Sequence, residues 1–507
     1  MPDTLRKFSP RKLRAVLITA FWLVMMGWLV QREFFASQRI HAYKPFISKN
    51  MLLSDQWMGI YFQQKLVGFL NSSVEPLFIA QGQSGYRITS NTVMHVSILR
   101  QRTKISFAGV ATVDENYQLR SFKFDLLSGE YRLSVFGRLR PGKSVDFTVT
   151  SPAGTTSRKI PLPRDKGVIF ASLVSPFHSF GNLAVGNRYS LSVFNPFSLN
   201  LEPLEITVEK KETLEIGGEP VEAFVVKTDY RGMRQVCWVD AQGEILKEET
   251  GMGFTMLRVP PGQATTLYER LVQAEVDITD MVSVPAALPL PADKISALTL
   301  RLRGVADIEM LRSPRQQVLD DDVAPPGTAV IRISREKLPA AGAPLPVRAF
   351  PEFLVSTDFI QAADARIQAT AREIVGAEAD SLAAALKINR WVATHLRKKP
   401  VVSVPSAVDV LRTREGDCNE HAVLMCALAR AAGIPAKIHI GLAYVDGRFY
   451  YHAWPSVYVG VWIDMDPTFG QDVADAAHIK LLEGDVPQQL DVVRLLGAIA
   501  VEVQEAE

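Results

Sequence analysis

The chain has 507 residues, of which 47% are hydrophobic and 22% are charged. At roughly 150 residues per domain, this length suggests about three folded units and excludes a single small module. Because the chain has only 30 prolines and 32 glycines, its composition also excludes collagen-like and disordered proteins. A net charge of +2 offers no extended basic field, so we expect no nucleic-acid partner. Three cysteines cannot form a disulfide framework.

The N-terminal segment places a basic cluster before an apolar run. Five of the first fourteen residues are Lys or Arg, and residues 15–30 carry no charge. A helix of this length spans ~24 Å, slightly less than the ~30 Å of a hydrocarbon layer. We predict that residues 1–37 form a cytoplasmic basic tail and a single transmembrane anchor in a bacterial inner membrane, with the bulk of the chain in the periplasm. A cleaved signal peptide and a buried core helix are the alternatives.

Apolar and polar residues alternate with a period of two between residues 50 and 275. Phe122, Phe124 and Leu126, for example, are separated by polar residues, and turn signals such as Asp240-Ala241-Gln242-Gly243 divide the apolar stretches. This alternation predicts half-buried antiparallel strands. We therefore predict a large antiparallel β-rich domain over 50–275, which serves either as a scaffold or as a groove for a lipid, a peptide or a partner.

Proline clusters interrupt the next segment, residues 276–350. Such clusters disfavour helices and suit connectors. Strand-like alternation nevertheless occurs at 298–302 and at 329–333. We predict a proline-rich connector with short strands.

The periodicity changes again in residues 351–507. Apolar residues recur at steps of three and four over 359–375 and 382–396, which predicts two amphipathic helices. A further helix is expected over 419–432, where Gly433-Ile434-Pro435 ends it. Three strands are then predicted at 437–442, 449–454 and 457–464, and a closing strand within 490–503. The predicted fold class is thus α+β, with an N-terminal transmembrane helix, a large antiparallel β module and a C-terminal α+β domain.

Cys418 lies where Gly416-Asp417 leads into the predicted helix over 419–432. The unpaired N–H groups and the dipole at a helix start favour a thiolate, so we predict a nucleophile of low pKa. A thiol that attacks an amide also needs an imidazole to move the proton, and that imidazole needs an acceptor to orient it. His452 on a predicted strand and Asp466 after the next strand can fill these roles, with Asp464 as an alternative orienting residue.

Three short motifs around these positions resemble the transglutaminase-like superfamily. They are Gly416-Asp417-Cys418, His452-Ala453-Trp454 and Asp466-Pro467-Thr468. The resemblance covers roughly residues 353–485 and implies a papain-like domain over 351–507 with Cys418 as nucleophile, His452 as acid–base and Asp466 as orienting residue. Two features depart from the family pattern: Pro455-Ser456 stands where an acidic residue often follows, and no calcium-binding acidic cluster is evident.

Trp454, His421 and Asp417 are further candidates for substrate or pocket residues. Trp454 is placed to shield the pocket from water, and His421 is placed to pack behind the nucleophile. Cys418 and His421 share one helix face, so a zinc site completed by His439 or His452 is an alternative. Because no second Cys-x-x-Cys or His pair occurs, we expect no metal and no cofactor.

The sequence therefore predicts a membrane-anchored cysteine peptidase, amidohydrolase or protein-glutamine acyltransferase-like enzyme. It would act on peptide or amide bonds of a peptide or protein substrate through a Cys418 thioester, and hydrolysis is favoured over transamidation. One alternative is a non-catalytic binding or assembly module with partners in the cell envelope. The other is a zinc-stabilised structural domain.

Overall fold

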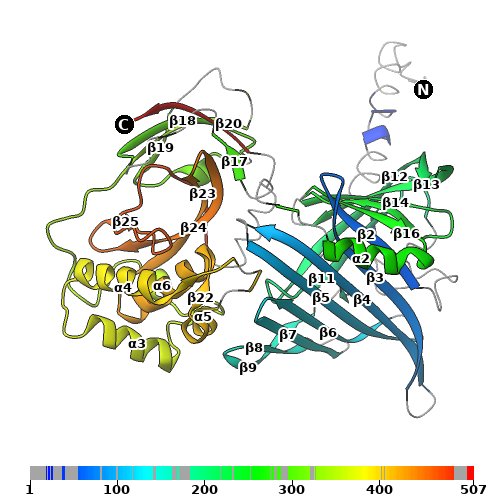
Figure 1. The fold of residues 1–507 in the computed structure, drawn as a ribbon, viewed down its shortest axis with the longest axis horizontal. Helices are drawn as coiled ribbons and strands as arrows, with labels where there is room; N and C mark the ends of the chain where they lie inside the picture. Colours follow the sequence, from blue (N-terminus) through cyan, green and yellow to red (C-terminus); the bar gives the residue numbers. More distant parts are fainter. Residues whose placement is uncertain are drawn as a thin grey trace, which may run out of the picture.

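The computed structural model describes residues 37–39, 55–79, 83–98, 101–116, 118–140, 144–162, 168–170, 183–216, 218–230, 233–251, 253–273, 276–278, 283–286, 290, 295–305, 307–319, 325, 327–400, 402–404, 406–484 and 499–507, together with six residues between 19 and 26. Two bodies are evident in Figure 1: a large β-sheet module built from the first half of the chain, and a mixed helix and sheet domain built from the second half.

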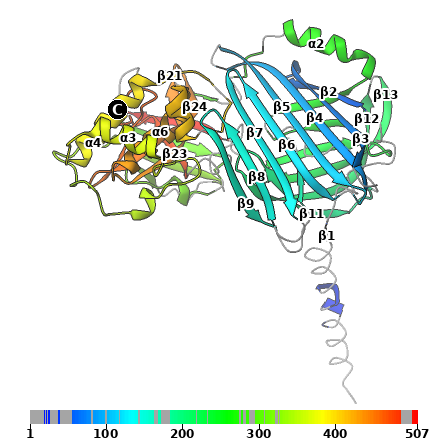
Figure 2. The same cartoon turned by 90° about the horizontal axis from the view of Figure 1, so that it is seen from below.

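The β module is one 16-stranded sheet whose long strands run side by side in Figure 2. Neighbouring strands pair antiparallel, except for the short strands β1 and β10, which pair parallel with β11. The strands are β1 (Ser37–Arg39), β2 (Asp55–Phe62), β3 (Lys65–Ile79), β4 (Gln83–Ile98), β5 (Gln101–Asp114), β6 (Leu119–Ser128), β7 (Tyr131–Arg140), β8 (Ser144–Ser151), β9 (Gly154–Pro161), β10 (Val168–Phe170), β11 (Arg188–Asn195), β12 (Asn200–Ile216), β13 (Glu219–Tyr230), β14 (Met233–Val239), β15 (Ile245–Glu249) and β16 (Phe254–Val259).

Apolar side chains of this sheet pack on each other across its concave face. Phe122 and Phe124 on β6 are buried, as the alternation predicts. Their rings lie 4.6 Å from Phe194 and 5.7 Å from Phe197, residues that belong to a distant part of the sheet. Because each buried aromatic side chain stabilises the fold by about 1.5–3 kcal/mol, these pairs favour a curved sheet over a flat one.

Two short helical segments, η3 (Pro261–Gln263) and α2 (Ala264–Gln273), follow the sheet. Leu267 and Leu271 of α2 are buried against Leu66 of β3, so the helix covers part of the sheet. Sequence periodicity did not reveal α2.

The second half of the chain places a layer of helices against a five-stranded sheet. The strand order is β17 (Ser283–Pro285), β24 (Arg448–Tyr458), β23 (Ala436–Val445) and β26 (His478–Glu483), with β25 (Trp462–Asp464) paired to β24. The helical segments are η6 (Pro351–Leu354), α3 (Ala365–Val375), α4 (Ser381–His395), α5 (Ala407–Thr413) and α6 (Cys418–Ala431), and β21 (Arg397–Lys398) pairs with β22 (Glu415–Gly416). Helix α6 is central, because it packs on α3, α4 and α5 and also on β23 and β24.

Several boundaries in this domain differ from the predicted ones. Helix α3 begins at Ala365 and not near 359, because the Asp364 side chain accepts a hydrogen bond from the Arg366 N–H and caps the helix there. Strand β24 continues through Pro455 to Tyr458, so the two predicted strands 449–454 and 457–464 are redistributed into β24 and β25. Helix α5 and strand β26 were not predicted.

A four-stranded sheet lies beside this five-stranded sheet. Its order is β19 (Gln316–Leu319), β20 (Thr328–Ser334), β18 (Ala297–Arg303) and β27 (Ala500–Ala506), and η5 (Glu309–Leu311) precedes β19. Leu300 of β18 and Ile331 of β20 share an apolar core with Ile479 of β26. Residues predicted as a connector are therefore packed against the five-stranded sheet. Strand β27, which overlaps the predicted closing strand at residues 500–503, pairs with β18.

The predicted fold class is wrong for the chain as a whole. Of the residues that the structure describes, 55% lie in strands and 18% in helices, so this part of the chain is mostly β. The α+β prediction gave too much weight to the helices between 365 and 431, whereas long strands dominate the first half. In the residues that the structure describes, no helix has the length and apolar character needed to cross a membrane. Most of the predicted anchor, residues 15–30, lies outside the described residues.

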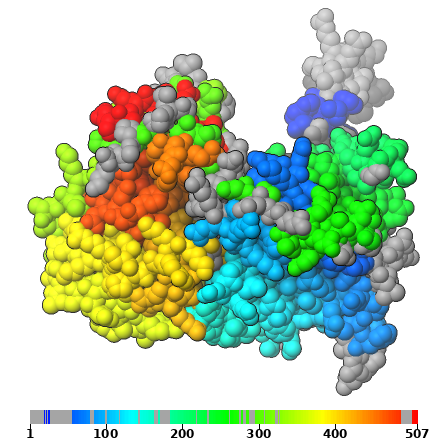
Figure 3. All heavy atoms as spheres, viewed as in Figure 1, coloured from blue at the N-terminus to red at the C-terminus, as the bar shows by residue number. Residues whose placement is uncertain are grey.

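The β module and the mixed helix and sheet domain contact each other directly (Figure 3). The Ser151 hydroxyl and the Ala153 N–H both donate to Asp409 Oδ1, at 2.8 and 2.5 Å. Arg158 also forms an ion pair with Asp358. These contacts fix the β8–β9 turn against the start of α5.

Candidate active site

Cys418 is the first residue of α6, and local hydrogen bonds determine this position. Asp417 caps the helix by accepting a hydrogen bond from the Asn419 N–H at 3.0 Å. Glu420 completes a capping box, since its Oε2 accepts from the Asp417 N–H at 2.9 Å. A Cβ atom at Gly416 would lie 2.2 Å from the Cβ of Glu420, so only glycine allows this close turn.

The thiol of Cys418 is not the low-pKa group that its helix position predicts. Burial raises its pKa well above the ordinary value, and the carboxylates of Asp417, Glu420 and Asp466 raise it further. The N–H of Ala453 acts in the opposite direction through a hydrogen bond to the sulfur, but it is outweighed. Desolvation and negative charge thus outweigh the helix dipole, and the resting group is a thiol.

His452 lies on β24, the strand against which α6 packs, and it faces Asp466. Its Nε2 lies 2.8 Å from Asp466 Oδ2. Because an ionised carboxylate only accepts hydrogen bonds, Nε2 must carry the proton, and Nδ1 of the neutral ring keeps its lone pair. The ring also stacks on Phe469 at 4.7 Å between centroids. The structure thus brings His452 and Asp466 together and holds the ring in one orientation.

Asp466 lies in the loop after β25, with four hydrogen bonds to its carboxylate. Oδ1 accepts from the N–H groups of Thr468 and Phe469, at 2.7 and 3.1 Å. Oδ2 accepts from His452 and, at 3.0 Å, from His478. Burial opposes ionisation of Asp466, but the two histidines outweigh it and hold the pKa of Asp466 well below its usual range.

Asp464, the alternative orienting residue, faces another histidine. Its Oδ2 accepts from His439 Nδ1 at 3.0 Å and from Trp454 Nε1 at 2.9 Å. Arg315, from the segment just before β19, approaches the same oxygen at 3.7 Å. Burial opposes the ionisation of Asp464, but His439 and Arg315 hold its pKa well below the usual range. Asp464 therefore supports the indole beside His452, while Asp466 contacts the imidazole itself.

The three candidate pocket residues lie close to Cys418, but none of them forms an open pocket wall. Trp454 is fully buried, and its indole lies nearly parallel to the His452 ring with 6.0 Å between centroids. Asp417 acts as the helix cap. His421 is fully buried, and its Nδ1 donates to the Asp417 carbonyl oxygen at 2.6 Å. Burial lowers the pKa of His421, so the neutral ring is favoured.

The alternative zinc site predicted around Cys418 and His421 does not form among the described residues. There, a single group of three possible ligand atoms converges within 4.8 Å, and it consists of His452, Asp466 and His478. Hydrogen bonds from both rings to Asp466 already account for this convergence. Cys418 and His421 do not belong to the group.

His478 is a residue of this site that the sequence analysis missed. It opens β26, twelve residues after Asp466, and is 2% exposed. No sequence motif surrounds His478. Only the prediction of a strand next to β23 would have made it a candidate site residue. Its second ring nitrogen, Nδ1, lies 3.0 Å from Asp475 Oδ1.

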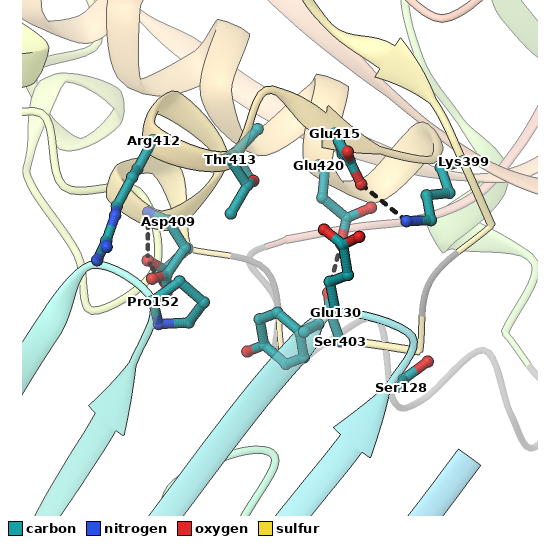
Figure 4. A pocket seen from close by; sticks show the side chains of 13 residues that line it. Ser128, Glu130, Pro152, Lys399, Ser403, Asp409, Arg412, Thr413, Glu415 and Glu420 are labelled. Atoms are coloured by element: carbon teal, nitrogen blue, oxygen red, sulfur yellow. Dashed lines mark hydrogen bonds and ion pairs between the residues drawn. The ribbon is translucent and has the colours of Figure 1, made fainter. Parts of the chain in front are cut away.

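A cavity of about 250 Å³ lies at the contact between the β module and the mixed helix and sheet domain (Figure 4). Glu130 reaches it from the β module, and Glu420 reaches it from α6, where it also binds the Ser403 hydroxyl. Lys399 pairs with Glu415 at its edge, at 3.0 Å. Cys418 does not line this cavity, so it is distinct from the candidate catalytic group.

Comparisons with known proteins agree with the motifs. Residues 368–467 match the transglutaminase-like superfamily. No curated protein matches the sequence. Among solved structures, a putative cysteine protease from Cytophaga hutchinsonii is 20% identical, with a TM-score of 0.29 and coverage of 42% of this chain and 86% of that one.

Two other solved structures match part of the chain with similarly low TM-scores. The periplasmic domain of TgpA from Pseudomonas aeruginosa, bound to ethylmercury, is 16% identical, with a TM-score of 0.25 and coverage of 37% of this chain and 83% of that one. A β-barrel-like protein of a domain of unknown function from Brucella abortus is 12% identical, with a TM-score of 0.26 and coverage of 40% and 94%. From the family match, the chain contains a transglutaminase-like domain, and Cys418, His452 and Asp466 lie within its matched residues.

Proposed function

We propose that the transglutaminase-like domain is a cysteine enzyme that acts on peptide or amide bonds, with Cys418 as nucleophile, His452 as acid–base and Asp466 as orienting residue. The observation that carries the proposal is the 2.8 Å hydrogen bond from His452 Nε2 to Asp466, on the strand that packs against the Cys418 helix. This bond leaves Nδ1 with the lone pair that a general base needs.

The first half of the reaction forms a thioester. Nδ1 of His452 takes the thiol proton as Cys418 Sγ bonds to the substrate carbonyl carbon. Deprotonation by His452 is required because burial keeps the resting group a thiol. The N–H of Cys418, at the first position of α6, has no acceptor within the helix and can donate to the developing oxyanion. The imidazolium then gives its proton to the amine as the C–N bond breaks.

The second half returns the enzyme to its starting state. Water loses a proton to His452 Nδ1 as its oxygen attacks the thioester carbon. The C–S bond breaks, the sulfur regains the proton, and a carboxylic acid leaves. We favour hydrolysis over transamidation because water needs no binding site of its own, whereas an amine acceptor does.

The nucleophile can be tested with iodoacetamide and mass mapping of the full chain. The thiols of Cys237 and Cys426 are buried, and Cys418 is half-buried, so the chain contains its own controls. We expect selective labelling of Cys418, and loss of peptide cleavage in Cys418→Ala but not in Cys237→Ala. Unlabelled Cys418, together with unchanged cleavage by Cys418→Ala, would exclude the proposal.

The choice between water and an amine as the group that attacks the thioester can be tested with an unfolded protein substrate in the presence of biotinylated cadaverine. Hydrolysis predicts new N-termini, or conversion of side-chain amides to acids, without incorporation of biotin. Biotin incorporation that depends on Cys418 and exceeds hydrolysis would show that transamidation is the main reaction.

The compartment is a separate proposal. We propose that the bulk of the chain is exported to the periplasm, because a basic cluster precedes the uncharged residues 15–30, as in export signals. Reporter fusions after residue 37 test this. Activity of a reporter that works only in the cytoplasm would contradict export.

A further inference from the structure

His478 is a second histidine on the carboxylate that orients His452. Both of its ring nitrogens face carboxylate oxygens, at 3.0 Å each: Nε2 faces Asp466 Oδ2 and Nδ1 faces Asp475 Oδ1. Asp475 is itself fixed as an acceptor, because its Oδ2 receives a hydrogen bond from Gln471 Nε2 at 2.8 Å and its Oδ1 receives one from the Ala477 N–H at 3.0 Å.

This geometry determines the charge of the ring. An ionised carboxylate can only accept hydrogen bonds, and a neutral imidazole has one N–H to donate. Only an imidazolium can donate to Asp466 and Asp475 at once. Burial alone favours the neutral ring, but the hydrogen bonds and charges of the two carboxylates outweigh it and raise the pKa of His478 to about 9.

We propose that His478 is a positioning residue: a constant imidazolium that holds Asp466 in place and limits the positive charge that His452 can take up. The inference deepens the proposed function and rests on it. His478 has no role as acid or base in the reaction, because both of its protons are committed to carboxylates.

The distance between the two rings makes the electrostatic effect large. Their centroids lie 5.7 Å apart. Two unit positive charges this close repel each other strongly in a buried site. The charge of His478 therefore opposes a second positive charge on the His452 ring.

The charged and titratable groups near this pair come from four elements. They are Asp466 after β25, Asp475 before β26, Cys418 and His421 on α6, and Arg315, which donates to the carbonyl oxygen of Asp475.

The charge of His478 can be measured without catalysis. In the full-chain Cys418→Ala protein labelled with ¹⁵N-histidine, we expect both ring nitrogens of His478 to carry protons at pH 7.5, with the signal assigned by its loss in His478→Gln. A single protonated nitrogen at pH 7.5 would overturn the proposal. Asp475→Asn supplies a second variant that leaves the histidine in place, and its His478 should lose one proton at neutral pH.

The effect on His452 is read from the pH profile of Cys418 alkylation by iodoacetamide. With His478→Gln and with Asp475→Asn, we expect the acid limb of the profile to move to higher pH by about one unit or more. His395→Gln, an exposed histidine on α4, is the matched control and should leave the limb in place. If the alkylation rate falls equally at every pH and the acid limb of the profile stays in place, His478 has only a structural role and the proposal is overturned.

The two proposals fail in different ways. If Cys418 is not alkylated selectively in the wild type, the proposed function fails, while the NMR measurement in Cys418→Ala still decides the charge of His478. If Cys418 reacts but His478 is neutral, only the positioning role fails. Should His478→Gln not fold, the alkylation profile of the Asp475→Asn protein decides the matter.

Discussion

The Tyr131 hydroxyl binds both backbone groups of Val404: it donates to the carbonyl oxygen at 3.1 Å and accepts from the N–H at 3.3 Å. Ser128 adds a third bond, since its hydroxyl accepts from the Val402 N–H at 3.2 Å. These bonds come from the β6–β7 hairpin of the β module and hold the segment between β21 and α5. The β module thus fixes a stretch of chain that leads to Cys418.

Removal of the Tyr131 hydroxyl should loosen this segment. Tyr131→Phe leaves two backbone groups without a partner, at a cost of about 1–2 kcal/mol. Hydrogen exchange of residues 402–409 should become roughly ten-fold faster or more. Tyr61→Phe, elsewhere in the β module, is the control. Equal exchange in both variants would mean that the hydroxyl contributes nothing to the contact.

The two neighbouring aspartates should differ in their effects. Asp466→Asn can turn an N–H towards His452 and impose the wrong tautomer, so we expect cleavage to fall by about 10²–10⁴-fold with a modest change in thermal stability. Asp464→Asn weakens the contacts with His439 and Arg315, so the denaturation temperature should fall more than the rate. Reversed results would assign the orienting role to Asp464.

The reactivity of Cys418 should rise with pH through the neutral range. Because burial raises its thiol pKa well above the ordinary value, little thiolate exists at pH 7 without help from His452. Alkylation by iodoacetamide should therefore be slow in His452→Ala at pH 7 and recover as the pH rises above 9. Fast alkylation of His452→Ala at pH 7 would mean that the helix dipole alone activates the sulfur.

The capping turn should not tolerate a side chain at Gly416. In Gly416→Ala the new methyl group meets Glu420, and we expect a loss of about 1–3 kcal/mol in the free energy of unfolding together with slower alkylation of Cys418. Gly262→Ala is the matched control, since a Cβ there has no atom within 4 Å. Similar melting curves for the two variants would contradict the close packing at the turn.

His478 should also make stability depend on pH. Its pKa is raised from 6.5 to about 9 on folding, so its contribution is fully present below pH 6.5 and is lost as the pH rises through 9. This pKa shift corresponds to a contribution of about 3 kcal/mol to the free energy of unfolding. Compared with the wild type, His478→Gln should therefore be much less stable at pH 6 and closer to it at pH 9.5. A constant difference across this range in denaturant titrations would exclude a charged His478.

Local patterns in the sequence predicted much of the fold. Alternation with a period of two marked the β module, and periodic apolar residues located α4 and α6 to within a residue of their observed starts. The missed elements include α2, α5 and β26, which are short and pack on distant parts of the chain. The predicted fold class was wrong because the long strands of the first half contain many more residues than the helices between 365 and 431.

The sequence alone determined the position of the candidate nucleophile at the start of a helix. Gly416, the Asp417 cap and the capping box with Glu420 all lie within five residues of Cys418. The tertiary structure alone decided which aspartate contacts His452, how deeply the thiol is buried and that His478 joins the site. These features depend on strands and loops far apart in the sequence, and the charge of each group follows from the partners that folding brings to it.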